Sequence, residues 1–573
     1  MNRRDHAVVA VLVLLLVGLG GALALPKPPA AEAVATPTPE PTLPPPATYR
    51  EGVVGVPASI TPITARTRAE RTLVGLVFSG LVRLGPDGAF EPDLATSWTT
   101  DESGKAWTFR IRDDATWQDG VPVTADDVVF TVEALKSPDA VGAMASSWAE
   151  VEVAAVDEHT VRFTLQTPIA GFLAAATQPL LPAHLLADVP FADLATHEFA
   201  TVPVGTGPYV LAELDQTKAV LVPTALLPPP VEEPETAPTL DPLATPVPAA
   251  TPARPVPYLE RIEVRFYDDA AALAAALESG EVDGAAGLPP EQTAALAAVD
   301  GIERSAYPTT TLSAVMLNLR PAHPELEDAR VRKALLASID RDTLVASVLG
   351  GDATRADALV PPTSWAFDAT SAPPLAFDRK QATKLLKDAG WKLADGAWTA
   401  PRGKARYEAE ILTVPAKASP RLAATAAFVR DAWTKLGLSV TLVELPAAEL
   451  VERLRAGTYT AAVVDIAMGL EPDVYPLLAS SQVRASGSNL SGYQDPALDT
   501  LLEAARAVGT PETRTAAWKA LLAGLAERQP ILPLAWSVDI MLARGLEGMS
   551  PRLIATPGDR FWDVLGWRLA TDR

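Results

Sequence analysis

The segment Leu81–Leu135 constrains the fold more tightly than any other part of this sequence. A Pro-Asp-Gly run at 86–88 predicts a tight turn, because Pro presets φ and Gly accepts a positive φ. Trp107, Phe109 and Ile111 then alternate with polar residues, which is the period of a half-buried strand. The first part of the segment therefore predicts strands joined by turns, with one apolar face.

A helix is predicted directly after this strand. Thr124 can cap its first turn, Asp127 follows three residues later as the acidic partner of a capping box, and Val128 begins the apolar body. Turn, strand and capped helix in this order indicate a mixed α/β protein.

Length and proline content predict how the chain is divided. A chain of 573 residues is too long for one hydrophobic core, so we expect at least two domains. Of its 54 prolines, nine lie in Pro26–Pro46 and twelve in Pro223–Pro257. Both tracts have little apolar surface to bury. We predict an extended linker at 26–48 and a disordered surface insertion at 223–257.

The N-terminus carries an export signal. Arg3 and Arg4 precede the apolar run Ala7–Leu25, which fits either a cleaved signal peptide or an uncleaved membrane anchor spanning residues 1–25. We favour the anchor, because the chain has no cysteine and so cannot be a lipoprotein held by a lipid-modified cysteine. Both alternatives predict that the rest of the chain lies outside the cytoplasm, at the cell surface or in the periplasm.

Charge and motif content narrow the class of function. The net charge of −22 argues against nucleic-acid binding, which needs clustered Lys and Arg. It is typical of a soluble secreted protein, and the alternative is a preference for cationic ligands. The sequence has no GxSxG, HExxH or GxxxxGK motif, so we predict a binding protein with no catalytic residues and no cofactor.

Further motifs follow the segment Leu81–Leu135 in a fixed order. They are Val204–Leu211 with its GTGPY run, Tyr258–Asp269, the GEVD run Gly280–Asp283, Val315–Leu319 with Asp328–Leu335, and Ile531–Trp536. Together they resemble the extracellular solute-binding protein family 5, the peptide- and nickel-type binding proteins of ABC importers. The resemblance covers Glu51–Leu221 and Tyr258–Arg544.

The resemblance implies an α/β, two-lobed periplasmic-binding-protein-like fold of class II, large, with an extra subdomain in lobe 1 and an N-terminal apolar helix before it. We place lobe 1 at 49–310, lobe 2 at 311–525 and a return to lobe 1 at 526–573. The implied function is capture of a small organic ligand between the lobes by a monomer that delivers it to ABC permease subunits. Peptide is the favoured ligand, and an oligosaccharide or opine is the alternative. For the function as a whole, the first alternative is a membrane-tethered ligand sensor or scavenger of the same fold without transport, and the oligosaccharide or opine binder is the second.

The segment Thr460–Leu477 carries the main candidate site. Peptide-binding relatives have an acidic residue a few positions before a Pro-Asp pair, and Met468 stands at that position here. Asp465 lies three residues earlier and can supply the charge from a shifted register, or it simply points out from an edge strand. Glu471 and Asp473 are predicted to order the loop. No histidine lies in this segment, which disfavours a metal ligand.

Two tryptophans extend the candidate site. Trp365 follows a loop that borders the cleft in relatives, and Trp536 lies on the segment that returns to lobe 1. Either can stack on a ligand, or pack in the core instead. Asn318 and Tyr209, which lie in the family-like motifs, complete the set of predicted ligand-binding residues.

Overall fold

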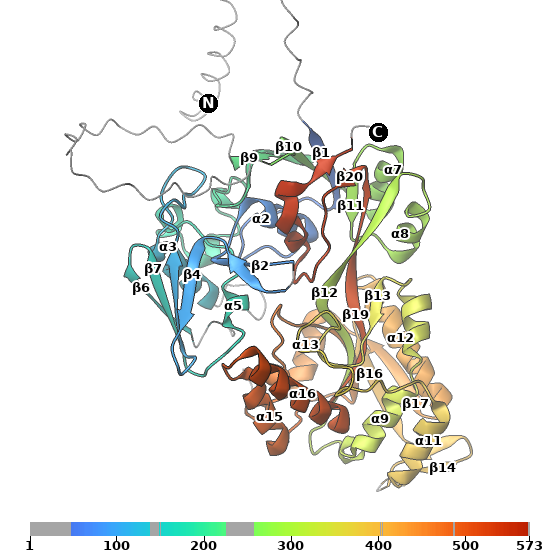
Figure 1. Ribbon diagram of the computed structural model, residues 1–573. Helices are drawn as coiled ribbons and strands as arrows, with labels where there is room; N and C mark the ends of the chain where they lie inside the picture. Colours follow the sequence, from blue (N-terminus) through green and yellow to red (C-terminus); the bar gives the residue numbers. More distant parts are fainter. Residues whose placement is uncertain are drawn as a thin grey trace, which may run out of the picture. The chain divides into compact units, whose positions relative to one another are not determined.

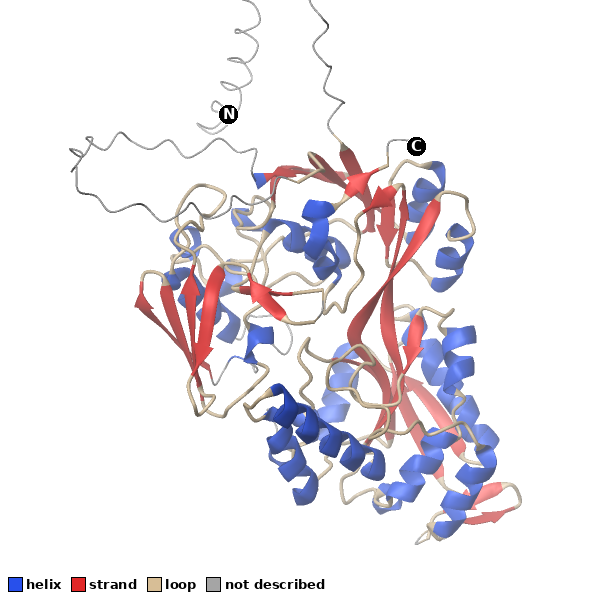
Figure 2. Cartoon of the chain, in the orientation of Figure 1, coloured by secondary structure: helices blue, strands red, loops and turns tan. Residues whose placement is uncertain are grey.

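The computed structural model (Figures 1 and 2) describes residues 47–86, 88–137, 148, 151–224, 257–401, 403, 405–484 and 487–570. The predicted N-terminal segment 1–25, the linker up to residue 46 and insertion residues 225–256 lie outside these ranges. Within the described ranges, no helix has the length and apolar content needed to cross a bilayer.

One mixed sheet of eleven strands has the order β17-β16-β18-β12-β19-β11-β1-β10-β9-β8, with β13 also paired to β19. Lobe 1 and lobe 2 name the residue ranges expected from the sequence, 49–310 and 311–525. Its strands are β1 (Thr48–Val54), β8 (Tyr209–Leu214), β9 (Lys218–Pro223), β10 (Arg261–Tyr267), β11 (Gly284–Ala286), β12 (Ile302–Leu317), β13 (Ala353–Arg355), β16 (Glu408–Thr413), β17 (Ser439–Glu444), β18 (Ala461–Ala467) and β19 (Ile531–Arg544).

The two longest strands, β12 and β19, connect the lobes and lie side by side (Figure 1). They pair in an antiparallel register that shifts between Pro308 and Leu312. Tyr307, before the shift, is buried in a lobe 1 cluster, and Leu312, after it, is buried in a lobe 2 cluster. On β19, buried residues up to Trp536 belong to clusters of lobe 2. Ile531–Trp536 therefore packs with lobe 2, although it lies in the segment 526–573 that was predicted to return to lobe 1.

A separate four-stranded sheet in the order β4-β5-β7-β6 lies within the lobe 1 range. Its strands are β4 (Ala95–Thr100), β5 (Ala106–Ile111), β6 (Val151–Asp157) and β7 (Thr160–Leu165), and β2 (Val82–Leu84) pairs with β3 (Phe90–Pro92) before them. Trp107, Phe109 and Ile111 are buried on β5, which confirms the predicted alternation. Strands β6 and β7 pair as an antiparallel hairpin.

Capping side chains mark helix starts in both lobes, and the cap predicted at Thr124 is confirmed. Before helix α3 (Ala125–Lys136), the Thr124 N–H donates to the Asp127 carboxylate over 2.9 Å, as a capping box requires. Asp328, Asp378 and Asp495 each accept a backbone N–H in the first turn of the helix that follows. Local sequence therefore sets where these helices begin.

The remaining helices and small strands of the described residues are as follows. In lobe 1 they are α2 (Arg68–Val77), α5 (Phe172–Ala175), α6 (Ala183–Leu186), η1 (Phe191–Asp193), η2 (Glu198–Ala200), α7 (Ala270–Ser279) and α8 (Pro290–Leu296). In lobe 2 they are η4 (Pro324–Leu326), α9 (Ala329–Ala337), α10 (Arg341–Thr343), η5 (Leu344–Val348), α11 (Arg379–Asp388), β14 (Lys392–Ala394), β15 (Ala397–Thr399), α12 (Pro420–Leu436), α13 (Ala447–Ala456), α14 (Tyr475–Leu478), η6 (Ser480–Gln482), α15 (Pro496–Arg506) and α16 (Pro511–Arg528). The return segment adds β20 (Leu546–Glu547), η7 (Pro557–Gly566) and β21 (Arg568–Leu569).

Lobe 2 has helices on both faces of its part of the large sheet. Side chains of α9, α11 and α12 share one buried cluster, to which β12 contributes Val315. Side chains of α15 and α16 share another, to which β12 contributes Leu312 and Ala314. Because side chains alternate along a strand, these clusters lie on opposite faces of the sheet, as Figure 2 shows.

Candidate functional site

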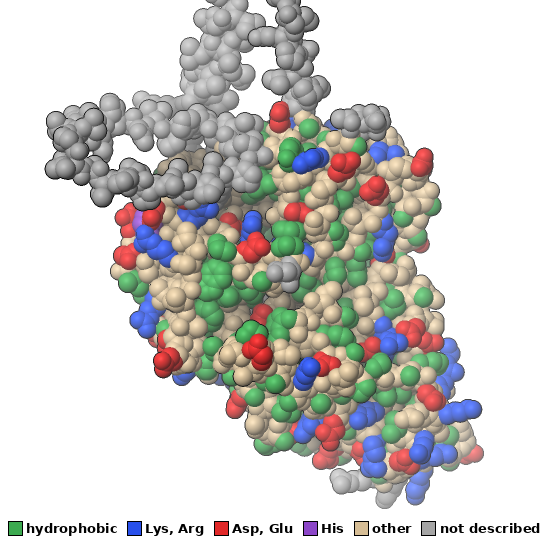
Figure 3. Space-filling model, viewed as in Figure 1, with side chains coloured by type: hydrophobic (Ala, Val, Ile, Leu, Met, Phe, Trp, Pro, Cys, Tyr) green, Lys and Arg blue, Asp and Glu red, His purple; other side chains and the backbone are tan. Residues whose placement is uncertain are grey.

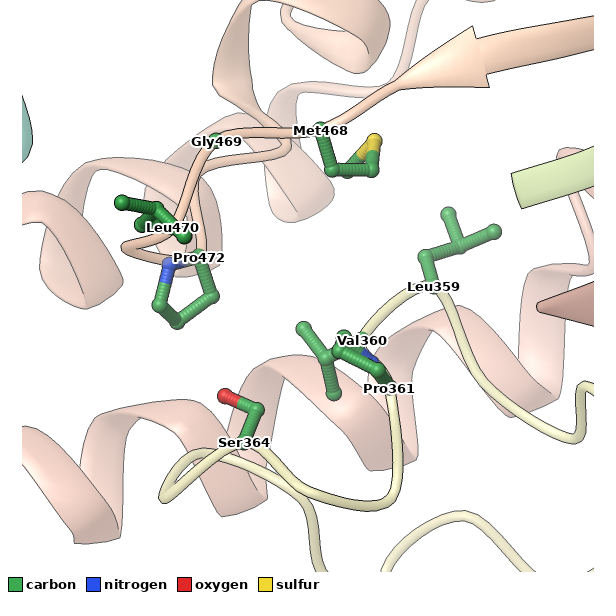
Figure 4. Close-up of a pocket in the computed structure, with 8 residues that line it drawn as sticks. All are labelled: Leu359, Val360, Pro361, Ser364, Met468, Gly469, Leu470 and Pro472. Carbon is green, nitrogen blue, oxygen red and sulfur yellow. The ribbon is translucent and has the colours of Figure 1, made fainter. Parts of the chain in front are cut away.

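Two loops of lobe 2 face each other across a small apolar pocket (Figure 4). One loop follows β13 and the other follows β18, and Met468 begins the second. The Met468 N–H donates to the carbonyl of Thr310 on β12 over 2.9 Å, which ties this loop to the connection between the lobes. The lining residues are Leu359, Val360, Pro361, Ser364, Met468, Gly469, Leu470 and Pro472.

Glu471 is held at the edge of this pocket by two side chains. The Trp365 indole N–H donates to Glu471 Oε2 over 3.2 Å, and the Arg514 guanidinium forms an ion pair with Oε1. Arg514 also lies 4.4 Å above the ring of Trp365, measured from Cζ to the ring centroid. Both Glu471 oxygens therefore have partners, and the carboxylate is fixed in place.

Asp473 forms a second ion pair in the same loop. Its Oδ2 lies 3.1 Å from Nε of Arg506, and its Oδ1 accepts the Tyr475 N–H over 3.0 Å. Burial raises the pKa of Asp473, and the nearby Arg506 partly offsets this effect. The prediction that Glu471 and Asp473 order the loop is confirmed by these bonds.

A second cavity lies where lobe 1 meets this loop. It encloses about 340 Å³, including the part open to solvent, and Pro472 lines both this cavity and the apolar pocket. Its lining residues are Ile169, Ala170 and Gly171 from lobe 1 and Glu471, Pro472, Asp473, Ala505, Arg506 and Arg514 from lobe 2. The cavity is therefore bounded by both lobes and by two ion pairs.

Asp465 lies apart from the pocket. It is on β18, paired with Ser313 of β12, and the Ser313 hydroxyl donates to Asp465 Oδ1 over 2.6 Å. Arg421, in the first turn of α12, forms an ion pair with Oδ2. Because α12 covers the sheet face opposite the cluster of Met468, Asp465 and Met468 are not brought together. The candidate carboxylate already has a cationic partner.

Sequence reasoning missed Arg421 and Arg514, which partner the acidic residues of this region. A Ser-Pro pair at 419–420 marks the start of α12, as its N-cap and first helical residue do in the structure. That signal locates Arg421 in the first turn of a helix, but nothing in the sequence indicates that this turn lies beside β18. The arginines could not have been assigned without tertiary contacts.

The two tryptophans lie on the Met468 side of the sheet. Trp536 shares a buried cluster with Met468 and is 2% exposed, so it forms the floor of the region and not its surface. Trp365 is 40% exposed and packs edge to face on Trp518 of the same cluster. Only Trp365 of the two presents a large accessible ring.

Asn318 and Tyr209 are both buried and bonded to backbone. The Asn318 amide donates to the carbonyls of Gly457 and Tyr459 over 2.9 and 2.8 Å, and the Tyr209 hydroxyl donates to Leu259 O over 3.0 Å. Each of them joins chain segments that are distant in sequence. The structure does not bring either to the pocket.

Beyond the two ion pairs of the cavity, neither surface charge nor metal-binding groups among the described residues point to a ligand. On the face in Figure 3, acidic and basic side chains are interspersed, although the whole chain carries a net charge of −22. Among the residues that the structure describes, no group of three or more His, Cys, Asp or Glu side chains is placed to hold a metal ion.

Comparison with known proteins identifies the family. The family model described as bacterial extracellular solute-binding proteins, family 5, matches residues 89–486. The oligopeptide-binding protein AppA of Bacillus subtilis is 24% identical over 505 residues, 87% of this chain and 88% of that protein. The nickel-binding periplasmic protein of Escherichia coli is 24% identical over 83% of this chain and 86% of its own length.

Solved structures agree with this assignment. NikZ from Campylobacter jejuni, in complex with Ni(L-His), superposes with a TM-score of 0.68 at 25% identity, covering 91% of this chain and 99% of NikZ. The chain therefore belongs to the bacterial extracellular solute-binding proteins of family 5, and it binds a solute outside the cytoplasm instead of catalysing a reaction.

Proposed function

We propose that this chain is the receptor of an ABC importer, which captures a small organic ligand between its two lobes and delivers it to permease subunits. The observation that carries the proposal is the cavity bounded by Ile169–Gly171 of lobe 1 and Glu471–Asp473 of lobe 2, next to the apolar pocket of Met468. A ligand at this position contacts both lobes, so its binding energy favours their closed arrangement.

A peptide is the ligand class that this chemistry favours. The small pocket favours an apolar group over a charged one, because Met468, Leu359 and Leu470 line it. The ion pairs Glu471–Arg514 and Asp473–Arg506 offer both signs of charge, which suits a zwitterion with an ammonium and a carboxylate. Met468 replaces the acidic residue of peptide-binding relatives, so in our proposal the terminal ammonium is met by Glu471.

Three of the candidate residues keep distinct roles in this proposal. Met468 and Trp365 contact the ligand, and Trp536 supports them from the buried cluster below. Asp465 stays a prediction as a ligand residue, and in that role it acts together with Arg421. Asn318 and Tyr209 also stay predictions, although their buried bonds favour a structural role.

The solved relatives bind different ligands, so alternatives remain. AppA of Bacillus subtilis was solved with a nonapeptide, NikZ with Ni(L-His), and AgaA with agropinic acid. None of the five histidines of this chain lies in 460–477, which makes a nickel chelate the weaker choice. An oligosaccharide or opine is the alternative ligand, and a tethered sensor or scavenger is the alternative role.

Domain boundaries and attachment are also part of the proposal. We place lobe 1 at 49–310, lobe 2 at 311–525 and the return at 526–573, with a monomeric body anchored by residues 1–25. The two arginines before the apolar run would keep the N-terminus in the cytoplasm and the body outside.

A thermal-shift panel tests the ligand class. The purified protein is screened against the dipeptide Ala-Leu, a nonapeptide, Ni(L-His), agropinic acid and maltotriose. We expect a peptide to raise the unfolding midpoint, because a ligand at 100 times its Kd stabilises the folded state by about 2.7 kcal/mol. A cooperatively unfolding protein that responds to none of the panel would contradict the proposal. Deletion of the gene should abolish uptake of the peptide that binds, whereas a sensor or scavenger would leave uptake unchanged.

A further inference from the structure

One contact of lobe 1 with lobe 2 is the short segment Ile169–Gly171, at the edge of the shared cavity. The Ala170 N–H donates to the carbonyl of Arg506, the last residue of α15, over 3.0 Å. Ile169 packs against the buried cluster of lobe 1, and Phe172 is buried in that cluster. The segment is therefore a fixed projection of lobe 1, joined to lobe 2 by a backbone hydrogen bond.

Gly171 allows an unusually close approach of the two lobes. Its φ of −82° and ψ of 14° are open to any residue, so backbone conformation does not require glycine here. A Cβ placed on Gly171 would lie 2.5 Å from Cγ and 3.1 Å from Cβ of Glu471. Glycine is thus needed at position 171 because a larger residue would collide with Glu471 of lobe 2. The turn itself does not require it.

Glu471 cannot easily move away from this contact. Both of its carboxylate oxygens are bonded, one to Arg514 and the other to Trp365, and Arg514 in turn lies over the Trp365 ring. The side chain is only 11% exposed. The lobes also come close at Gly104 of lobe 1 and Val508 of lobe 2, since a Cβ added to Gly104 would lie 2.3 Å from Cγ2 of Val508.

We infer that Ile169–Gly171 and the lobe 2 surface formed by Glu471, Arg506 and Arg514 are a latch that holds the lobes closed. The latch shares Glu471, Arg506 and Arg514 with the cavity proposed to hold the ligand, and it acts before a ligand binds. It sets the fraction of molecules that are closed, and the apparent affinity for any ligand that needs the closed state scales with that fraction. This role rests on the proposed capture of a ligand between the lobes, but the test below requires no ligand.

A disulfide can detect the latch directly, because the full chain has no cysteine of its own. The variant Gly171→Cys/Glu471→Cys places two Cβ atoms about 3.1 Å apart, close to the roughly 3.5–4.5 Å of disulfides. We expect oxidation to remove both free thiols from the monomer, with a cross-linked peptide containing positions 171 and 471. If both thiols stay reactive while the circular dichroism spectrum and unfolding transition match those of the parent, the latch is refuted.

A matched control uses Gly566, where an added Cβ meets nothing within 4 Å. The pair Gly566→Cys/Glu471→Cys should keep both thiols under the same oxidation. If the control cross-links as completely as Gly171→Cys/Glu471→Cys, the cross-link does not report a specific contact between positions 171 and 471, and the result counts against the latch.

A single substitution tests the latch without changing Glu471. Gly171→Leu should increase the radius of gyration measured by small-angle X-ray scattering, because the added side chain cannot fit against the fixed Glu471. Gly566→Leu should leave the scattering unchanged. Identical scattering curves for Gly171→Leu and the parent would overturn the inference. A failed ligand panel would leave these results intact, so failure of the latch and failure of the proposed function can be told apart.

Discussion

At the scale of single residues, the partner of a charged group decides what that group can do. Asp465 and Glu471 are both carboxylates within one predicted ligand-binding segment. Asp465 pairs with Arg421 on the face of α12, whereas Glu471 pairs with Arg514 beside the pocket and touches lobe 1. The two carboxylates are chemically alike, but they have different arginine partners and lie in different parts of lobe 2.

The Asp465–Arg421 pair should contribute little to stability. Its side chains are 27% and 32% exposed, so solvent screens their attraction. In a double-mutant cycle with Asp465→Asn and Arg421→Gln, we expect a coupling of about 0.5–1 kcal/mol in the free energy of unfolding, measured by urea denaturation. A coupling of zero would contradict this prediction, because the pair would then make no net contribution to stability.

Met468 should tolerate only apolar replacement. It is 8% exposed and packs with Leu359 and Val360, so Met468→Glu would bury a carboxylate without a partner. We expect Met468→Glu to lower the free energy of unfolding by about 1–3 kcal/mol and Met468→Leu to lower it by less than about 1.5 kcal/mol. If the denaturation curves of Met468→Glu and Met468→Leu coincide, the environment of residue 468 is not buried and apolar.

At the scale of elements, helix starts are the best-determined features of this chain. Helix α2 begins with a capping box in which Thr67 and Glu70 bond each other's backbone N–H groups. Glu70 also accepts the Arg66 N–H over 2.7 Å and the Ala58 N–H over 3.2 Å. One buried carboxylate thus fixes both the helix start and the strand-to-helix connection.

Stability at this helix should depend on pH. Burial alone raises the pKa of Glu70, but the N–H groups of Thr67, Arg66 and Ala58 outweigh it, so the pKa lies below its ordinary 4.5. A lowered pKa stabilises the fold above about pH 4.5, and this contribution is lost as pH falls through the folded-state pKa. Glu70→Gln should therefore cost about 1–2 kcal/mol at pH 7.

The cost of Glu70→Gln should shrink below pH 4.5, because protonated Glu70 resembles glutamine. Urea denaturation at pH 7 and at several lower values measures the difference. Glu102→Gln, at an exposed residue of the β4–β5 turn, is the control and should cost nothing measurable at either pH. A cost for Glu70→Gln that stays constant with pH would show that the carboxylate charge is not responsible.

At the scale of the whole molecule, the connection between β9 and β10 should be replaceable. The two strands are antiparallel neighbours, with Leu221 opposite Ile262, so a short link can join them. Replacing residues 226–255 with a short Gly/Ser linker should leave the unfolding midpoint within about 2 °C of the parent, measured by calorimetry. A larger drop would show that the replaced residues stabilise the fold.

Much of the architecture could be predicted from local patterns. The alternation at Trp107–Ile111 and the capping box of Thr124 and Asp127 depend on neighbours in sequence, and both are confirmed. Residues 315–317 of the motif Val315–Leu319 form the end of the longer β12, whose pairing with β19 continues back to Ile302. A strand's length depends on its partner, which local sequence does not specify.

The candidate site was predicted less completely. The segment 460–477 does contain Met468 and Glu471, which border the pocket. The arginines that neutralise its carboxylates lie at 421, 506 and 514, on three helices whose packing no local pattern reveals. Trp365 and Trp536 looked equivalent as sequence, and only burial separated an accessible ring from a core residue.

Sequence by itself determined the α/β class, the helix starts and the order of family-like motifs, because these depend on residues within a few positions of each other. Tertiary structure alone decided which charges meet. Arg68 binds Asp539 over 2.7 and 3.0 Å, and Arg560 binds Glu51, although both pairs join opposite ends of the chain. The physical reason is that an ion pair forms wherever packing brings two groups within a few ångströms, and that distance is set by the whole fold.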